Sequence, residues 1–111
     1  MMRGVSHIYL YDEDQRIFGM GPCKLLHAIE KTGSLRKAAA SMELSYSKAI
    51  HMIHRAEAAL GFPLTEKFIG GKGGGGSRLT EEAVEFIRKF EAYEEACHEA
   101  AETLYDQFFS E

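Results

Sequence analysis

Apolar and polar residues follow two different periods along the chain, and the two periods predict a mainly α-helical fold with a small antiparallel β wing. Residues 5–11 alternate and are rich in β-branched and aromatic residues, which predicts a strand. Residues 64–70 also alternate, and residues 77–79 could return antiparallel to them. In the remaining segments apolar residues recur every three or four positions, as on one face of a helix.

Residues that typically start or stop helices divide the helical part into four segments. Pro22 suits the first turn of the first helix, and Gly33 is placed to end it. Ser34 is expected to cap a short second helix, and Ser45 a longer third helix over residues 45–60. Thr80 is expected to cap a last helix that meets no proline or glycine through residue 109.

The last helix carries an apolar stripe that is too long for one small domain to cover. About 30 helical residues extend for roughly 45 Å. Packing on the chain's own core would explain the first half of the stripe and leave the second half exposed. We therefore expect a homodimer in which two such helices pair about a twofold axis. The expected interface residues are Ala83, Phe86, Phe90, Tyr93, Cys97, Ala100, Leu104 and Phe108.

Charge is distributed unevenly along the 111 residues, although the formal net charge is only −4. Residues 1–80 hold eleven lysines and arginines against seven aspartates and glutamates, whereas residues 81–111 hold two against ten. A basic body followed by an acidic tail indicates that the two parts face different partners. We therefore treat residues 1–80 as a domain suited to an anionic partner and residues 81–111 as a dimerisation helix of the same structural unit.

Composition points to a single cytoplasmic domain with no membrane partner. The content of 45% hydrophobic and 27% charged residues is ordinary for a globular protein. No apolar run approaches 18 residues, and the first ten residues lack the pattern of a secretory signal. The two cysteines form no CxxC pair, which fits a reducing compartment.

The second and third helices have the sequence form of a helix-turn-helix, in which the third helix enters the major groove of DNA. Its opening turn should then carry unobstructed hydrogen-bonding side chains, while the start of the second helix meets the DNA backbone. A helical hairpin with a merely solvated polar face would have the same spacing. The expected DNA contacts on the two helices are Ser34, Arg36, Lys37, Ser45, Tyr46, Ser47, Lys48, His51 and Arg55.

The glycine-rich segment 70–77 favours the DNA-binding interpretation, because a winged helix-turn-helix has a hairpin at this place in the chain. Glycine lets such a loop approach the sugar-phosphate backbone closely, and the two basic residues supply charge. The expected contacts are Gly71, Lys72, Gly73, Gly74, Gly75, Gly76, Ser77 and Arg78.

Other interpretations of the same segment fit less well. Residues 71–76 match G-x-G-x-x-G, but the chain is too short for the βαβ unit of a dinucleotide-binding fold. A P-loop needs its lysine directly before serine or threonine, and Lys72 precedes Gly73. A flexible linker would leave the strand at residues 64–70 without a partner.

Catalytic and metal-binding patterns are sparse. His51, His54 and Glu57 fall within one broad helix face, but the usual pair of histidines four residues apart is missing. No nucleophile and base appear in a recognisable arrangement. We expect no enzyme activity, no cofactor and no metal.

Two stretches resemble known bacterial regulators. "GSLRKAAASMELSYSKAIHMIHRAEAALGFPLTEK", residues 33–67, resembles the winged helix-turn-helix of LysR-type regulators. "GGKGGGGSRLT", residues 70–80, is similar to the wing of ModE-type molybdate-responsive regulators, where a glycine-rich loop surrounds one lysine. With the leading strand and the long last helix, the similarity to the ModE N-terminal domain covers nearly the whole chain.

The resemblance implies a dimeric bacterial transcription regulator that binds double-stranded DNA. A dimer with one such helix in each of two successive major grooves is expected to occupy an inverted-repeat operator. Full-length ModE-type regulators also carry a C-terminal molybdate-binding module, and this sequence has no residues after Glu111 to form one. We therefore expect molybdate not to bind this chain. An alternative is a protein-interaction module that has the winged-helix fold and no affinity for DNA.

Overall fold

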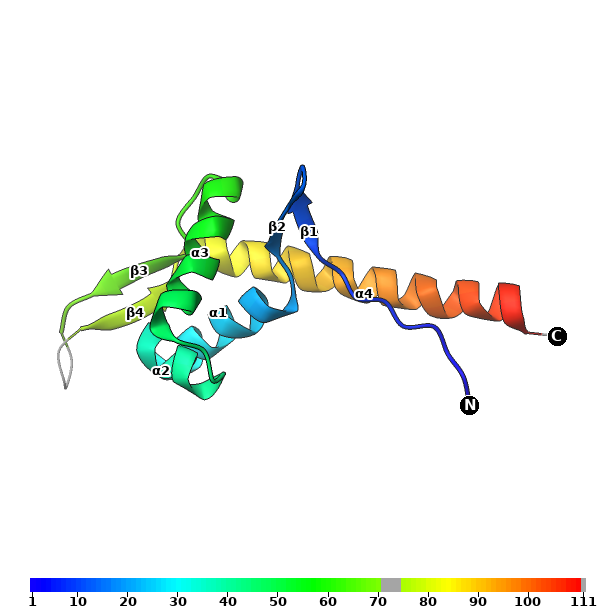
Figure 1. Ribbon diagram of the computed structural model, residues 1–111, viewed down its shortest axis with the longest axis horizontal. Coiled ribbons are helices and arrows are strands. Elements are labelled where there is room, and N and C mark those ends of the chain that lie inside the picture. Colours follow the sequence, from blue (N-terminus) through cyan, green and yellow to red (C-terminus); the bar gives the residue numbers. More distant parts are fainter. Residues whose placement is uncertain (71–74, 111) are drawn as a thin grey trace.

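The computed structural model describes residues 1–70 and 75–110 and has the expected mainly helical architecture. Figure 1 shows a small body of helices from which a two-stranded wing projects at one end and a long helix at the other. The molecule measures 61 × 31 × 25 Å. Along the chain the elements are β1 (Leu10–Asp12), β2 (Gln15–Phe18), α1 (Met20–Thr32), α2 (Leu35–Ser41), α3 (Tyr46–Leu60), β3 (Thr65–Phe68), β4 (Gly76–Leu79) and α4 (Glu81–Phe109).

The predicted helix caps are confirmed. The hydroxyl oxygens of Ser34, Ser45 and Thr80 each accept a hydrogen bond from the backbone N–H three residues later, at 3.0 to 3.1 Å. Gly33 and Gly61 end α1 and α3 in the left-handed conformation that glycine adopts without steric cost.

The core forms where α1, α3 and the start of α4 meet β2. Phe18 is fully buried, and its ring packs edge-to-face against the rings of Phe86 and Phe90, with centroids 4.8 and 4.9 Å apart. Leu25 and Ile29 of α1 are also fully buried. The first part of α4 is therefore joined to the helix-turn-helix by one continuous core.

The N-terminal strand prediction is wrong for residues 5–9, which belong to no strand. The strand covers Leu10–Asp12 instead, and it pairs antiparallel with Gln15–Phe18 to form a hairpin that the pattern did not reveal. Burial does alternate over residues 4–10, with the even-numbered positions partly covered. Part of this cover comes from α4, because a Cβ on Gly4 would lie 2.8 Å from the carbonyl oxygen of Ala101. Figure 1 shows the N-terminal segment running beside α4.

The two halves of α4 differ in how they are covered. Ala83 and Phe90 are buried in the chain's own core, and Phe86 packs on Phe18. These three predicted interface residues therefore make contacts within the chain. In the second half Tyr93 and Phe108 remain 52% and 76% exposed. Leu104 and Ala100 are exposed as well, and Cys97 is half-buried. A dimer interface over this second half stays a prediction.

The wing hairpin is confirmed over its described residues. β3 and β4 pair antiparallel, with Thr65 opposite Leu79 and Phe68 opposite Gly76. At the base of the hairpin, the buried Thr80 hydroxyl donates a 2.7 Å hydrogen bond to the carbonyl oxygen of Pro63. The wing and the first turn of α4 are thereby fixed to each other. Within residues 1–70 and 75–110, no helix is both long enough and apolar enough to cross a membrane.

Candidate nucleic-acid interface

The starts of α2 and α3 lie together and present polar side chains to solvent. Ser34 and Ser45 use their hydroxyls as caps, so both helices begin with ordered turns. The guanidinium of Arg36 lies over the ring of Tyr46, 4.3 Å from its centroid, which joins the two helix starts. The remaining side chains predicted to contact DNA here are exposed: Lys37, Ser47 and Lys48.

The wing is held against this same region. The backbone N–H of Ser77 donates a 2.9 Å hydrogen bond to the carbonyl oxygen of Gly33, directly before α2. Gly76 lies so close to Gly33 and to the ring of Phe68 that a Cβ at this position would overlap the Gly33 carbonyl oxygen. The glycine at position 76 therefore serves the docking of the wing onto the helices.

An open groove of about 420 Å³ separates the start of α2 from the wing. The helices contribute Ser34, Arg36 and Tyr46 to this groove. Lys67 of β3 lines it from the wing side together with Gly75. The fold thus gathers predicted contacts that lie some 40 residues apart in the sequence around one concave surface.

Lys67 is a candidate contact that the sequence interpretation missed. It lies directly opposite Ser77 in the hairpin, and residues directly opposite each other in an antiparallel pair share a face. Because Ser77 was among the predicted contacts, the alternation of the 64–70 strand already contained the signal. Lys67 is exposed on this face.

The other predicted wing contacts differ in charge pairing, in exposure and in whether they lie within the described residues. The Arg78 side chain forms a 3.0 Å ion pair with Glu66 across the two strands, which offsets part of its charge. Gly75 is exposed at the described end of the loop. The predicted contacts Gly71, Lys72, Gly73 and Gly74 lie outside the described residues.

His51 and Arg55 lie further along α3 and face a different region. They line an open pocket of about 330 Å³ together with Asp12 and Gln15 of the β1–β2 hairpin. His51 is exposed and Arg55 is half-buried. The structure therefore separates these two residues from the groove beside the wing.

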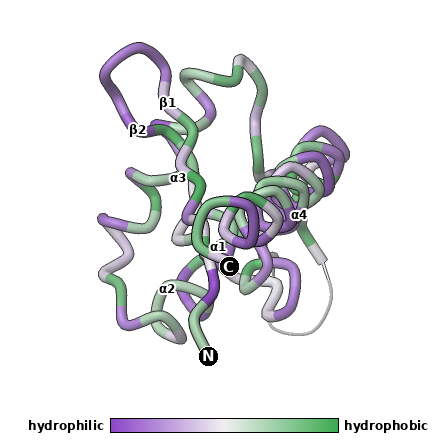
Figure 2. The backbone as a smooth tube through the Cα atoms, turned by 90° about the vertical axis from the view of Figure 1, so that its right-hand side faces the viewer, coloured by the Kyte–Doolittle hydropathy of each residue, from purple (hydrophilic) through white to green (hydrophobic). Residues whose placement is uncertain are grey.

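Four basic side chains near the groove have no ion-pair partner among the described residues. Arg36, Lys37, Lys48 and Lys67 form no ion pair with any other residue in the described ranges. The acidic residues concentrate on α4, which leaves the body in the opposite direction. Figure 2 shows both purple hydrophilic and green hydrophobic segments on α4. Such an arrangement presents a cationic surface at one end, suited to an anionic polymer.

Comparison with known proteins agrees with this geometry. Residues 22–84, more than half of the chain, match the family described as "Bacterial regulatory helix-turn-helix protein, lysR family". The chain is 43% identical over 74 residues to the "Molybdenum transport protein ModE" of Herbaspirillum seropedicae, which covers 67% of this chain and 26% of that protein. It is 31% identical over 84 residues to the "Transcriptional regulator ModE" of Haemophilus influenzae, covering 76% of this chain and 33% of that protein.

A third relative, the "Molybdenum transport protein ModE" of Azotobacter vinelandii, is 35% identical over 71 residues. These matches cover a third or less of each relative's own length. The family match spans α1 through the first turn of α4, which includes both helices of the helix-turn-helix and the wing. The chain therefore belongs to the LysR-type family of bacterial DNA-binding helix-turn-helix regulators, and its domain is of the ModE type.

Proposed function

We propose that this chain regulates transcription as a symmetric homodimer that binds an inverted-repeat site in double-stranded DNA. The first turn of α3 enters the major groove, and the wing lies along the neighbouring sugar-phosphate backbone. The two copies of α3 occupy successive major grooves about 34 Å apart.

The observation that carries this proposal is the gathering of free cationic side chains around the groove between α2 and the wing. Arg36 and Lys67 line this groove from opposite sides. Lys48 is exposed on the first turn of α3, where base edges would be reached. A DNA duplex would contact the wing and the start of α2 at the same time, which explains why the wing is hydrogen-bonded next to that helix start. A helical hairpin with a merely solvated polar face would not require this arrangement.

The dimer is supported by the apolar side chains on the second half of α4. Tyr93, Leu104 and Phe108 are half or more exposed, and Cys97 and Ala100 lie between them on the same helix face. Their spacing of three to four residues is that of one helix stripe, which a second copy of α4 could cover. Twofold pairing there would hold the two α3 helices at a fixed separation.

The proposal is tested by selecting bound fragments from genomic DNA and measuring affinity for the selected and for unrelated duplexes at several salt concentrations. Lys67→Ala should weaken binding to all duplexes alike and reduce the slope of log K against log salt by about 0.9, because one phosphate contact is lost. Lys48→Ala should instead reduce the preference for the selected sequence, by about tenfold for a base contact worth 1–3 kcal/mol.

Lys89→Ala is the matched control, since Lys89 is an exposed lysine of α4 outside the groove. It should leave both the salt slope and the sequence preference unchanged. Equal effects of all three substitutions would refute the division between backbone and base contacts. The absence of affinity for any duplex at low salt would refute DNA binding and favour a protein-interaction module.

A further inference from the structure

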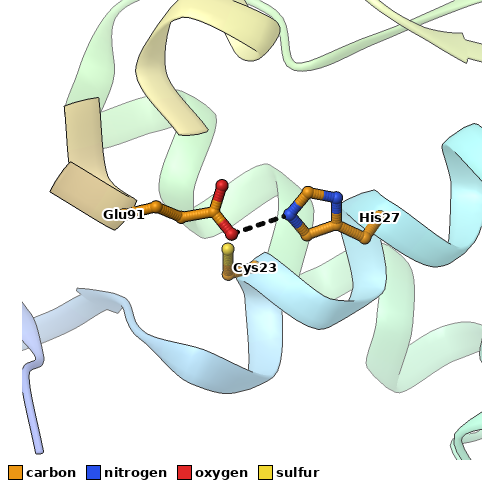
Figure 3. A group of neighbouring side chains, drawn as sticks. All are labelled: Cys23, His27 and Glu91. Atoms are coloured by element: carbon orange, nitrogen blue, oxygen red, sulfur yellow. Dashed lines mark hydrogen bonds and ion pairs between the residues drawn. The ribbon is translucent and has the colours of Figure 1, made fainter. Parts of the chain in front are cut away.

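Three metal-binding side chains meet where α1 packs against α4. Cys23 and His27 lie one helical turn apart on α1, and Glu91 reaches them from α4 (Figure 3). The Nε2 atom of His27 is 3.0 Å from Oε2 of Glu91, and the sulfur, nitrogen and oxygen atoms all lie within 4.8 Å of one another. Over residues 1–70 and 75–110 this is the one group of three such ligands.

The donor set suits a borderline-soft divalent ion. Zinc binds thiolate, imidazole and carboxylate at about 2.0 to 2.3 Å with tetrahedral geometry, so its ligand atoms lie roughly 3.5 Å apart. The atoms of this cluster are already near that separation, and side-chain movements of about 1 Å would complete it. Calcium and magnesium prefer oxygen ligands only and fit the thiol and imidazole poorly.

Several carboxylates surround the cluster, and Arg88 also lines the adjoining pocket. The Oε1 atom of Glu30 lies 3.8 Å from Nδ1 of His27, on the side of the ring opposite Glu91. At this distance Glu30 forms no hydrogen bond with the ring, but its carboxylate adds negative charge beside His27. Desolvation by burial, followed by the negative charges of Glu91 and Glu94, raises the pKa of the Cys23 thiol to about 11. A divalent ion would relieve this concentration of negative charge, and the thiol would release its proton to solvent on binding.

The cluster is accessible from solvent. His27 and Glu91 are each about half exposed and line an open pocket of about 180 Å³ that also includes Glu30. Cys23 does not line this pocket, and only 5% of its surface is exposed. An ion could enter from the pocket beside His27 and Glu91 and keep water as its fourth ligand.

We propose that Cys23, His27 and Glu91 bind one Zn²⁺ ion, or a divalent transition ion of similar chemistry, and that the bound ion ties α1 to α4. The site is separate from the groove beside the wing, and it does not depend on DNA binding. An ordinary surface pair of His27 and Glu91 beside a core cysteine is the competing explanation, and it predicts no response to metal.

The test uses the full chain after treatment with a chelator, with Co²⁺ and Zn²⁺ as probes. Co²⁺ should produce the absorption of a tetrahedral thiolate complex, and equimolar Zn²⁺ should remove it. Cys97→Ser should retain this signal because Cys97 is the other free cysteine and lies outside the cluster. Cys23→Ser should abolish the signal.

Glu91→Gln and His27→Gln test the site without changing a core residue, because both residues are about half exposed and their replacement should leave the fold intact. Each should weaken Zn²⁺ binding by more than about tenfold in calorimetry, with an unchanged circular dichroism spectrum. Zn²⁺ should raise the Tm of the unmodified protein and of Cys97→Ser, and a chelator should reverse the rise. The proposal is overturned if Zn²⁺ leaves the Tm unchanged, or if Glu91→Gln and His27→Gln bind it as tightly as the unmodified protein.

Discussion

Replacing Thr80 by valine removes one buried hydroxyl group and should lower the free energy of unfolding. The Thr80 hydroxyl has two roles: it accepts the N–H of Ala83 to cap α4, and it donates to the carbonyl oxygen of Pro63. Thr80 has a relative exposure of only 4%; its hydrogen bond with Ala83 is buried, and its hydrogen bond with Pro63 is partly buried. Valine keeps the shape of threonine and removes only the hydroxyl.

The magnitude follows from these two hydrogen bonds. The buried N–H of Ala83 left without its capping partner costs about 1–3 kcal/mol, and the loss of the partly buried hydrogen bond to Pro63 costs about 1 kcal/mol. The free energy of unfolding should therefore fall by about 2–4 kcal/mol. Thr80→Ser is the matched control, because it keeps the hydroxyl and loses one methyl group, worth about 0.8 kcal/mol.

Urea denaturation followed by circular dichroism measures the difference between the two variants. With a slope of about 2 kcal/mol per molar urea, the valine variant should unfold at a midpoint lower than that of the serine variant by roughly 1 M. All samples need the same protein concentration, since association would add to the apparent stability. A valine variant as stable as the serine variant would refute the assignment of Thr80 as the joint between the wing and α4.

Three further outcomes are expected. Leu104→Glu places a charge on the exposed stripe of α4 and should convert a dimer to a monomer in light scattering, whereas an unchanged mass would remove this surface from the interface. Gly76→Ala should weaken DNA binding at least several-fold without unfolding the protein, because the new Cβ would overlap the Gly33 carbonyl oxygen and displace the wing; unchanged affinity would show that the docking of the wing is unimportant. Iodoacetamide at pH 8 should modify Cys23 more slowly than Cys97, because burial raises the pKa of Cys23 to about 11 and leaves little thiolate; equal rates by mass spectrometry would contradict this.

The helices and the wing could be predicted from the sequence because their ends are fixed by local chemistry. A serine or threonine hydroxyl reaches the N–H three residues later whatever the rest of the chain does, and glycine takes the left-handed conformation that ends α1 and α3. The wing is indicated by the alternation of residues 64–70, the glycine-rich loop after them and a short segment, residues 77–79, that could return antiparallel.

The N-terminal segment was misassigned because alternation reports one-sided burial and does not say what covers the buried side. Residues 4–10 alternate in burial without a neighbouring strand, and Gly4 instead lies against Ala101 of α4. The cluster of Cys23, His27 and Glu91 was missed for a related reason. The cysteine and histidine have visible i, i+4 spacing, but their carboxylate partner is 64 residues from the histidine and only packing brings it there.

The length of α4 makes the molecule sensitive to small changes near Phe90. Beyond this residue the helix extends for roughly 28 Å, while its first turns are held by the rings around Phe18. The helix is therefore anchored in the core at one end only. A rotation of about 5° at that end would move its C-terminal end by roughly 2.5 Å. A movement at the α1–α4 junction would be largest at the C-terminal end of α4, and in the proposed dimer it would change the angle between the two copies.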